Sequence, residues 1–149
     1  MKSTMDTSNK RKPIIGFTTS RGLILDLDST TLKEAKWIAD KYCRRFKLQG
    51  YLIMRSSTFN YHVIFNRPLR WPSVIEMLFK IAWYYHYHKH GVKPRLMNWA
   101  ILQAIKHSCT LRIGPKGRKK PPKAAFQYGK NDKLIRDYLQ FFQEQNRGD

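Results

Sequence analysis

The sequence predicts a single α+β domain in which one sheet is covered by helices. The chain has 149 residues, a length that fits one domain and can bury a hydrophobic core. Short apolar stretches with the two-residue alternation of strands lie between longer stretches with helical spacing. Residues 1–12 are polar and basic and contain no apolar signal-peptide core. We therefore expect a flexible basic tail over 1–12 and one domain over 13–149.

The first half of the chain predicts a strand, a helix and a hairpin. Thr31 and Glu34 form a Thr-x-x-Glu capping box, which predicts a helix that begins there and ends near Phe46. Turn-forming residues over 56–60 indicate a hairpin between the strands on either side. The strands predicted in this half cover 23–28, 51–54 and 61–65, and the apolar residues over 14–17 form either a short strand or a segment packed under the sheet.

The second half predicts further helices and one more strand. The helices are expected over 73–90, 96–106 and 132–143, a strand over 109–113, and an extended segment over 124–128. The order strand, helix, strand, strand, helices, strand predicts an RRM-like (ferredoxin-like βαββαβ) sheet with extra helices. In this arrangement the first and third strands are neighbours. His62, on the third strand, should then lie beside the acidic residues of the first.

Those acidic residues are Asp26 and Asp28, which follow Ile24 in alternation with three leucines. Side chains two positions apart on a strand share a face, so the leucines can enter a core while the two carboxylates stand together on the other side. Their Cα atoms would be about 6.6 Å apart, which lets both carboxylates reach one metal ion or a pair of ions. The alternative is structural, because Asp-Ser-Thr after a strand also suits the cap of the next helix.

Charge is the most unusual property of the composition. The formal net charge is +19, and Glu76 is the single acid between Lys41 and Asp132. Such self-repulsion favours a polyanionic partner, and nucleic acid is the leading candidate, with an anionic membrane surface as the competitor. No apolar run approaches the length of a spanning helix. Cys43 and Cys109 are far apart, which argues against a zinc ribbon or a disulfide scaffold. We expect a soluble, cytoplasmic protein.

Three motifs in the order of the chain resemble the catalytic domain of archaeo-eukaryotic primases and the related plasmid and viral primase-polymerases. The first is an apolar strand ending in Asp-x-Asp, here residues 25–28. The second is a Ser, a turn and a His that opens an apolar strand, here Ser57 and His62. The third is a basic strand and loop over 110–116. The similarity covers residues 22 to about 123 and is spread over short motifs.

The resemblance implies a replication protein that binds single-stranded DNA or RNA as template, uses nucleoside triphosphates and acts with other replication subunits. Asp26 and Asp28 would bind Mg²⁺ or Mn²⁺ and, with His62, form the catalytic set. The residues implied to contact the incoming nucleotide are Ser57, His62, Arg112 and Lys116. The residues expected to contact nucleic acid are Arg55, Tyr61, Arg118, Lys119, Lys120 and Lys123.

Two departures from the family pattern leave an alternative open. Thr58 and Asn60 replace the glycines of the second motif, and no acid lies between Glu76 and Asp132, where the family has its third carboxylate. Glu76 is on a predicted helix and is a poor substitute. The alternative is a non-catalytic relative that binds nucleic acid.

Other clusters suggest further readings. His86 and His90 share a helix face and could ligate zinc, although a helix C-terminus also favours histidine. The His-Tyr-His sequence over 86–88, with Tyr138 as nucleophile, is similar to a rolling-circle nicking endonuclease, but 86–88 is predicted to be helical.

Aromatic residues expected to stack on bases near the sheet face are Tyr51, Phe59, Tyr61 and Tyr128.

Overall fold

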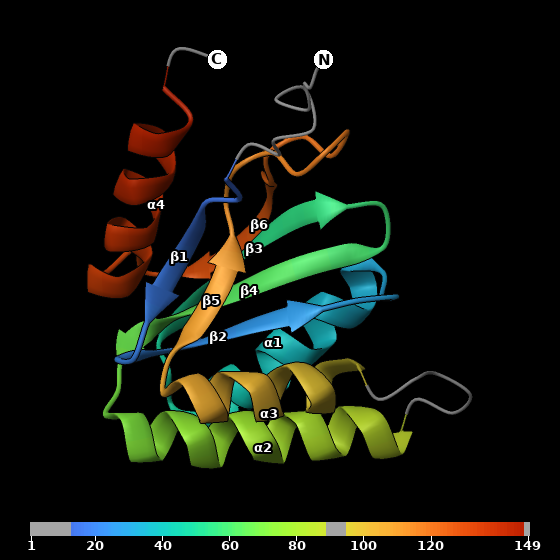
Figure 1. The fold of residues 1–149 in the computed structure, drawn as a ribbon. Coiled ribbons are helices and arrows are strands. Elements are labelled where there is room, and N and C mark those ends of the chain that lie inside the picture. Colours follow the sequence, from blue (N-terminus) through green and yellow to red (C-terminus); the bar gives the residue numbers. More distant parts are fainter. Residues whose placement is uncertain (1–12, 89–94, 148–149) are drawn as a thin grey trace, which may run out of the picture.

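A four-stranded and a two-stranded antiparallel sheet form the strand framework of the protein (Figure 1). The computed structural model describes residues 13–88 and 95–147. The larger sheet has the order β2-β4-β3-β6, and the smaller sheet pairs β1 with β5. The strands are β1 Gly16–Thr19, β2 Gly22–Leu27, β3 Gly50–Ser57, β4 Asn60–Pro68, β5 Cys109–Arg112 and β6 Lys123–Gly129.

Four helices pack on this framework: α1 Leu32–Phe46, α2 Trp71–His88, α3 Arg95–Lys106 and α4 Lys133–Gln145. The predicted capping box begins α1. The backbone N–H of Glu34 donates to Thr31 Oγ1 (3.1 Å), and the N–H of Thr31 donates to Glu34 Oε1 (3.2 Å), so two of the unpaired donors at the helix start are satisfied. The helix ends at Lys47, which adopts a left-handed conformation (φ 55°).

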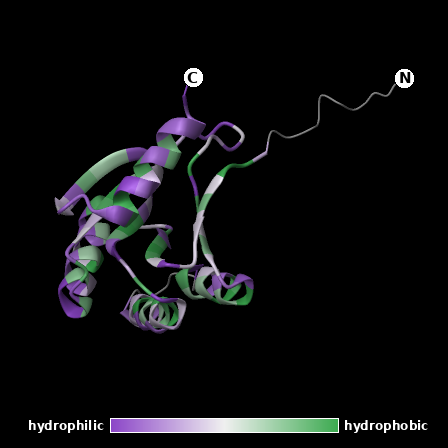
Figure 2. Ribbon diagram, turned by 90° about the vertical axis from the view of Figure 1, so that its left-hand side faces the viewer, coloured by the Kyte–Doolittle hydropathy of each residue, from purple (hydrophilic) through white to green (hydrophobic). Residues whose placement is uncertain are grey.

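The larger sheet lies between α1 on one face and the β1–β5 pair with α4 on the other (Figures 1 and 2). Figure 2 shows α2 and α3 end-on and side by side below the strands, with hydrophobic and hydrophilic residues interspersed along each helix. The hydroxyl of Tyr51 on β3 donates to Asp40 Oδ1 on α1 (2.5 Å). Tyr51, Val63 and Phe65 therefore lie on the α1 face, and His62 and Ile64 lie on the opposite face.

The structure is compatible with the predicted ferredoxin-like arrangement, with two differences at the sheet edges. As predicted, β4 lies between β2 and β3. However, β5 forms its ladder with β1, where Phe17 pairs with Leu111 and the Thr18 and Thr110 hydroxyls are 2.8 Å apart. The opposite edge is extended by β6, which pairs with β3. The fourth strand of the predicted sheet thus lies over the sheet rather than within it.

Placing β5 over the sheet buries β2 on both faces. Leu23, Leu25 and Leu27 are buried as expected from their alternation, and Ile24 on the other face is also fully buried. Within β2, Asp26 is the one residue that is not fully buried. In the part of the chain that the structure describes, no helix combines the length and apolar character needed to cross a bilayer.

Candidate functional site

Asp26 and His62 lie directly opposite each other on neighbouring strands. They are register partners in the β2–β4 ladder, and Asp26 Oδ1 is 3.6 Å from His62 Nε2. His62 is only 3% exposed, whereas the Asp26 side chain is 30% exposed. The expectation that His62 stands beside Asp26 is confirmed.

Asp28 lies just beyond the end of β2 and is partly exposed. Its Oδ2 is 3.9 Å from Nη1 of Arg95, the first residue of α3. Its backbone carbonyl is 3.5 Å from the hydroxyl of Tyr85 on α2. The second carboxylate therefore lies near a cation, and its side chain is about as exposed as that of Asp26 (34% against 30%).

Burial gives Asp26 an unusual ionisation. Desolvation, and next the negative charge of Asp28, raise the pKa of Asp26 from 3.8 to about 7, against the opposing effects of Arg112, Lys119 and Lys116. Burial, and next the charge of Arg112, lower the pKa of His62 to about 3. At neutral pH His62 is therefore uncharged, and it does not neutralise Asp26. Asp26 itself, with a pKa of about 7, is only partly ionised at neutral pH, because burial disfavours its charged form.

Arg112 of β5, near Asp26, donates hydrogen bonds to the end of β3 and to the loop that follows β5. Its Nη2 donates to the carbonyl of Ser56 (2.7 Å), and its Nη1 donates to the carbonyls of Gly114 (2.5 Å) and Lys120 (3.0 Å). These bonds join β5 to the end of β3 and to the loop over 113–122. Arg112 thus holds the basic loop in place and supplies positive charge near Asp26. Its guanidinium already donates three hydrogen bonds to backbone carbonyls.

The basic loop forms a tight turn above the carboxylates. Lys116 and Lys119 exchange two backbone hydrogen bonds of 3.0 and 2.8 Å, and Gly117 at the tip has a positive φ of 58°. A pocket of about 260 Å³ lies between this loop and the β3–β4 turn. Its lining residues are Arg55, Ser56, Ser57, Thr58, Lys119, Lys120, Pro121 and Lys123.

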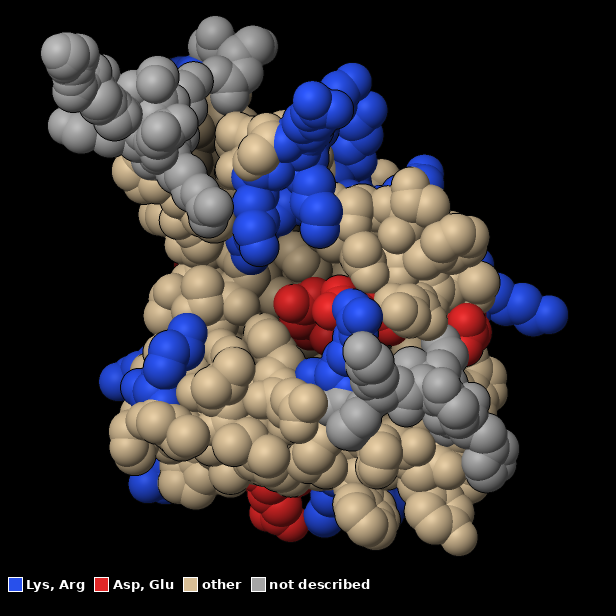
Figure 3. All heavy atoms as spheres, turned by 45° about the vertical axis from the view of Figure 1, so that its right-hand side comes forward, with Lys and Arg blue, Asp and Glu red and all other residues tan. Residues whose placement is uncertain are grey.

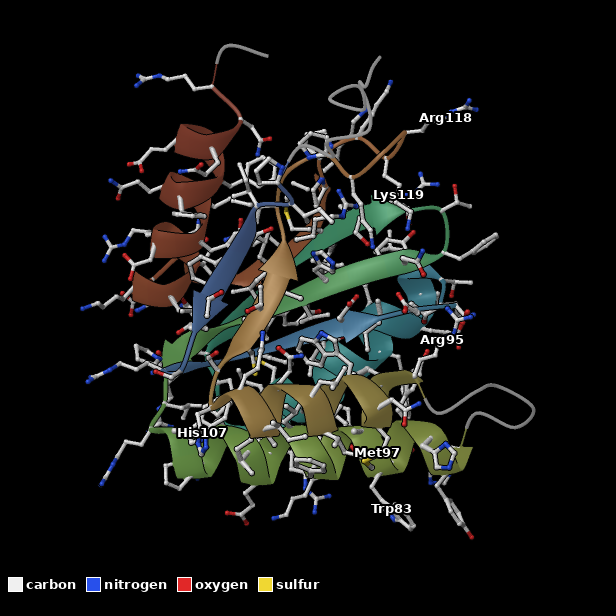
Figure 4. All side chains as sticks on the ribbon, viewed as in Figure 1. Trp83, Arg95, Met97, His107, Arg118 and Lys119 are labelled. Carbon is white, nitrogen blue, oxygen red and sulfur yellow. The ribbon has the colours of Figure 1, made fainter. Side chains whose placement is uncertain are left out.

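Positive side chains border the acidic residues on two sides. Figure 3 shows acidic atoms at the floor of a hollow, with Lys and Arg atoms on either side of it. In Figure 4, Arg118 and Lys119 lie on one side of the end of β2 and Arg95 lies on the other. A phosphate-bearing ligand entering the hollow would thus meet positive charge from two directions.

The turn of the second motif is built without glycine. Asn60 Nδ2 donates to Ser57 Oγ (2.6 Å), and Asn60 Oδ1 accepts from the backbone N–H of Ser29 (3.2 Å). Phe59 takes the left-handed position (φ 61°), and its carbonyl accepts from the Thr30 N–H (2.8 Å). The turn is therefore held by an asparagine side chain and bound to the segment that follows Asp28.

Some residues expected at the site are elsewhere. Tyr61 is 8% exposed and shares the α1 face with Val63, so the expectation that it stacks on a base is not supported by its position. Tyr51 is completely buried on the same face, whereas Phe59 and Tyr128 are exposed. Tyr138 is completely buried, its hydroxyl has no hydrogen-bond partner among the described residues, and burial raises its pKa. That environment is unfavourable for a tyrosine nucleophile.

The structure also locates the remaining acids and histidines. Glu76 is exposed on α2 and pairs with Lys80 one turn later (3.0 Å), so it does not complete the carboxylate set. His86 and His88 are exposed near the end of α2, as predicted for a helix, and His90 lies outside the described residues. Over 13–88 and 95–147, no three His, Cys, Asp or Glu side chains are grouped to hold a metal ion.

Two contributors were missed by sequence reasoning. Arg95 reaches Asp28 because α3 packs near the end of β2, and no spacing in the sequence connects these segments. The sequence identifies Asn60 only as a turn residue, whereas its side-chain amide both accepts from the Ser29 N–H and donates to Ser57 Oγ.

Asp26 and Asp28 fit a cation that also binds a ligand's oxygen atoms better than a cation coordinated by protein side chains alone. Mg²⁺ in nucleotide sites is often held by one or two carboxylates, with phosphates and water completing its shell. Asp26 and Asp28 supply two such carboxylates, and the charge of Asp28 is, after desolvation, the second cause of the raised pKa of Asp26. Comparison with known proteins found no matching family model, curated protein or solved structure.

Proposed function

We propose that the protein is a replication protein of the primase-polymerase type that binds single-stranded nucleic acid and transfers nucleotides. The observation that carries this proposal is the pair Asp26 and Asp28 with cations close to it. Arg95 of α3 lies 3.9 Å from Asp28, and the charges of Arg112, Lys116 and Lys119 act on Asp26. Paired carboxylates within a strongly basic surface suit a negatively charged substrate that brings a divalent cation with it.

Each side chain has a distinct part in this proposal. Asp26 and Asp28 would hold Mg²⁺ or Mn²⁺, which when bound activates the attacking 3′-hydroxyl and stabilises the leaving pyrophosphate. His62, neutral and buried, would position the Asp26 carboxylate, which lies 3.6 Å from its Nε2. Arg112 holds the loop in place, so that Lys116 and the neighbouring lysines can neutralise phosphate charge.

The small basic pocket supports a phosphate contact beside the carboxylates. Ser57 and Thr58 provide hydroxyl groups, and Arg55, Lys119 and Lys120 provide cations around a space of about 260 Å³. Hydroxyl and cationic donors around a small hollow are the groups that phosphate oxygens accept from. We assign this pocket to phosphates of the bound nucleotide or strand.

A non-catalytic nucleic-acid-binding relative is the second candidate. Two observations favour it: among the described residues no third acid is grouped with Asp26 and Asp28 to hold a metal ion, and Arg95 lies close to Asp28. In this candidate Arg95 and the loop lysines bind phosphates, and the carboxylates serve only to position them.

Primer synthesis and extension on single-stranded DNA, with Mg²⁺ or Mn²⁺, tests the proposal. The informative variant is Asp26→Asn/Asp28→Asn, which preserves side-chain shape and removes both charges. Glu76→Gln is the matched control, because it removes an exposed acid outside the site. We expect product from the wild type and from Glu76→Gln, and none from the double variant. Intact DNA binding without product from the wild type would instead support the non-catalytic candidate.

A further inference from the structure

A second hollow, of about 620 Å³, lies between α1 and α2. This volume is in the range of about 300–1,000 Å³ that is usual for small-molecule sites. Its wall includes Tyr85, whose hydroxyl is 3.5 Å from the backbone carbonyl of Asp28. The hollow is therefore adjacent to the segment that carries the second carboxylate, although none of the residues assigned to the first site lines it.

Aromatic rings form a ladder along this hollow. The rings of Trp37 and Tyr84 are stacked with centroids 5.8 Å apart, and Tyr84 is in turn 4.1 Å from the ring of His88. Trp37 is 52% exposed, whereas the core aromatics nearby are buried. A half-exposed indole at the end of a stack can accept another flat ring.

Two lysines and two acids line the hollow, and a third lysine lies beside the ladder. Lys33 and Lys36 line the hollow, and Lys41 places its Nζ 4.6 Å from the Tyr84 centroid. The two acids that line it already have partners within the protein. Glu34 Oε1 accepts from the Thr31 N–H in the capping box, and Asp40 Oδ1 accepts from the Tyr51 hydroxyl.

We infer that the α1–α2 hollow binds an unpaired base of a single-stranded nucleic acid, which stacks on Trp37 while Lys33 and Lys41 neutralise the flanking phosphates. This inference rests on the proposed binding of single-stranded nucleic acid and adds a second contact for the strand. A duplex cannot make the contact, because its bases are already stacked within the helix. The hollow would therefore discriminate single strands from duplexes.

Fluorescence anisotropy with a labelled oligo-dT strand tests the inference. We expect Trp37→Ala to raise Kd about tenfold, because loss of one stacked base is worth about 1–3 kcal/mol. Trp37→Phe should recover most of the affinity. Trp83→Ala is the matched control, because Trp83 is also exposed (62%) but points outward from α2 (Figure 4), and it should leave Kd within about twofold.

Photocrosslinking with a strand that contains 5-iododeoxyuridine gives a second readout that does not depend on a variant. We expect the crosslinked peptide to contain Trp37. Normal affinity of Trp37→Ala, an equal loss in Trp83→Ala, or crosslinks confined to other peptides would overturn the inference and leave the proposed function standing. Absence of single-strand binding by the wild type would overturn both.

Discussion

Replacing Asp26 by asparagine should stabilise the protein, and the gain should grow with pH. The folded protein binds the Asp26 proton more tightly than the unfolded chain does, because burial raises the pKa from 3.8 to about 7. Ionisation therefore lowers stability progressively between pH 3.8 and about 7, and the whole penalty is present above that range. Asparagine stays neutral and avoids this penalty.

The magnitude follows from the same pKa values. Each pKa unit corresponds to about 1.36 kcal/mol, so the rise in the pKa of Asp26 from 3.8 to about 7 corresponds to about 4 kcal/mol of lost stability when Asp26 is fully ionised. Because the Asp26 side chain is 30% exposed, water solvates part of its charge, and we expect about 2 kcal/mol at pH 8. For a chain of this size that is a rise of about 4–8 °C in Tm.

The assay is urea or thermal unfolding of both proteins at several pH values between 4.5 and 8. The difference in free energy of unfolding should be small at the acidic end and about 2 kcal/mol at pH 8. His62 is common to both proteins, so its own titration largely cancels. Glu76→Gln, with its exposed carboxylate, should change stability by less than about 0.5 kcal/mol at every pH. A destabilised Asp26→Asn protein, or a difference that does not change with pH, would refute the reasoning.

Three further predictions concern the residues that shape the site. Asn60→Ala should lower the free energy of unfolding by about 1–2 kcal/mol, measured in urea, because two hydrogen bonds of the turn are lost. Asn60→Asp, which keeps an acceptor, should lose less. Arg112→Met should raise the pKa of Asp26 further, since Arg112 opposes that rise, and NMR titration of the carboxyl carbon measures it; an unchanged pKa would contradict this. Lys119→Gln/Lys120→Gln should weaken DNA binding and reduce the salt slope by about two, and an unchanged slope would show that this loop does not contact phosphates.

Local patterns in the sequence were sufficient to predict those features that one alternation of residues or one helix cap determines. The leucine alternation predicted β2, the Thr31–Glu34 box predicted the start of α1, and the strand order predicted His62 beside Asp26. The burial of Tyr61 was readable from the same alternation, because Tyr61 and His62 are consecutive and must face opposite sides of the sheet.

Other features depend on contacts between distant segments. The pattern over 109–113 indicates a strand but does not specify its neighbour, so the pairing of β5 with β1 could not be predicted. That pairing places Arg112 beside Asp26, where its charge opposes the rise in the pKa of Asp26 and contributes to the lowering of the pKa of His62. The approach of Arg95 to Asp28 likewise depends on how α3 packs.

Binding of Mn²⁺ together with a nucleoside triphosphate, measured by isothermal titration calorimetry, tests the central claim most directly. The claim is that Asp26 and Asp28 face a divalent cation and its nucleotide. The account predicts that Mn²⁺ strengthens nucleotide binding to the wild type and to Glu76→Gln, and that this effect is lost in Asp26→Asn/Asp28→Asn. Equal Mn²⁺-dependent binding by all three proteins would contradict it.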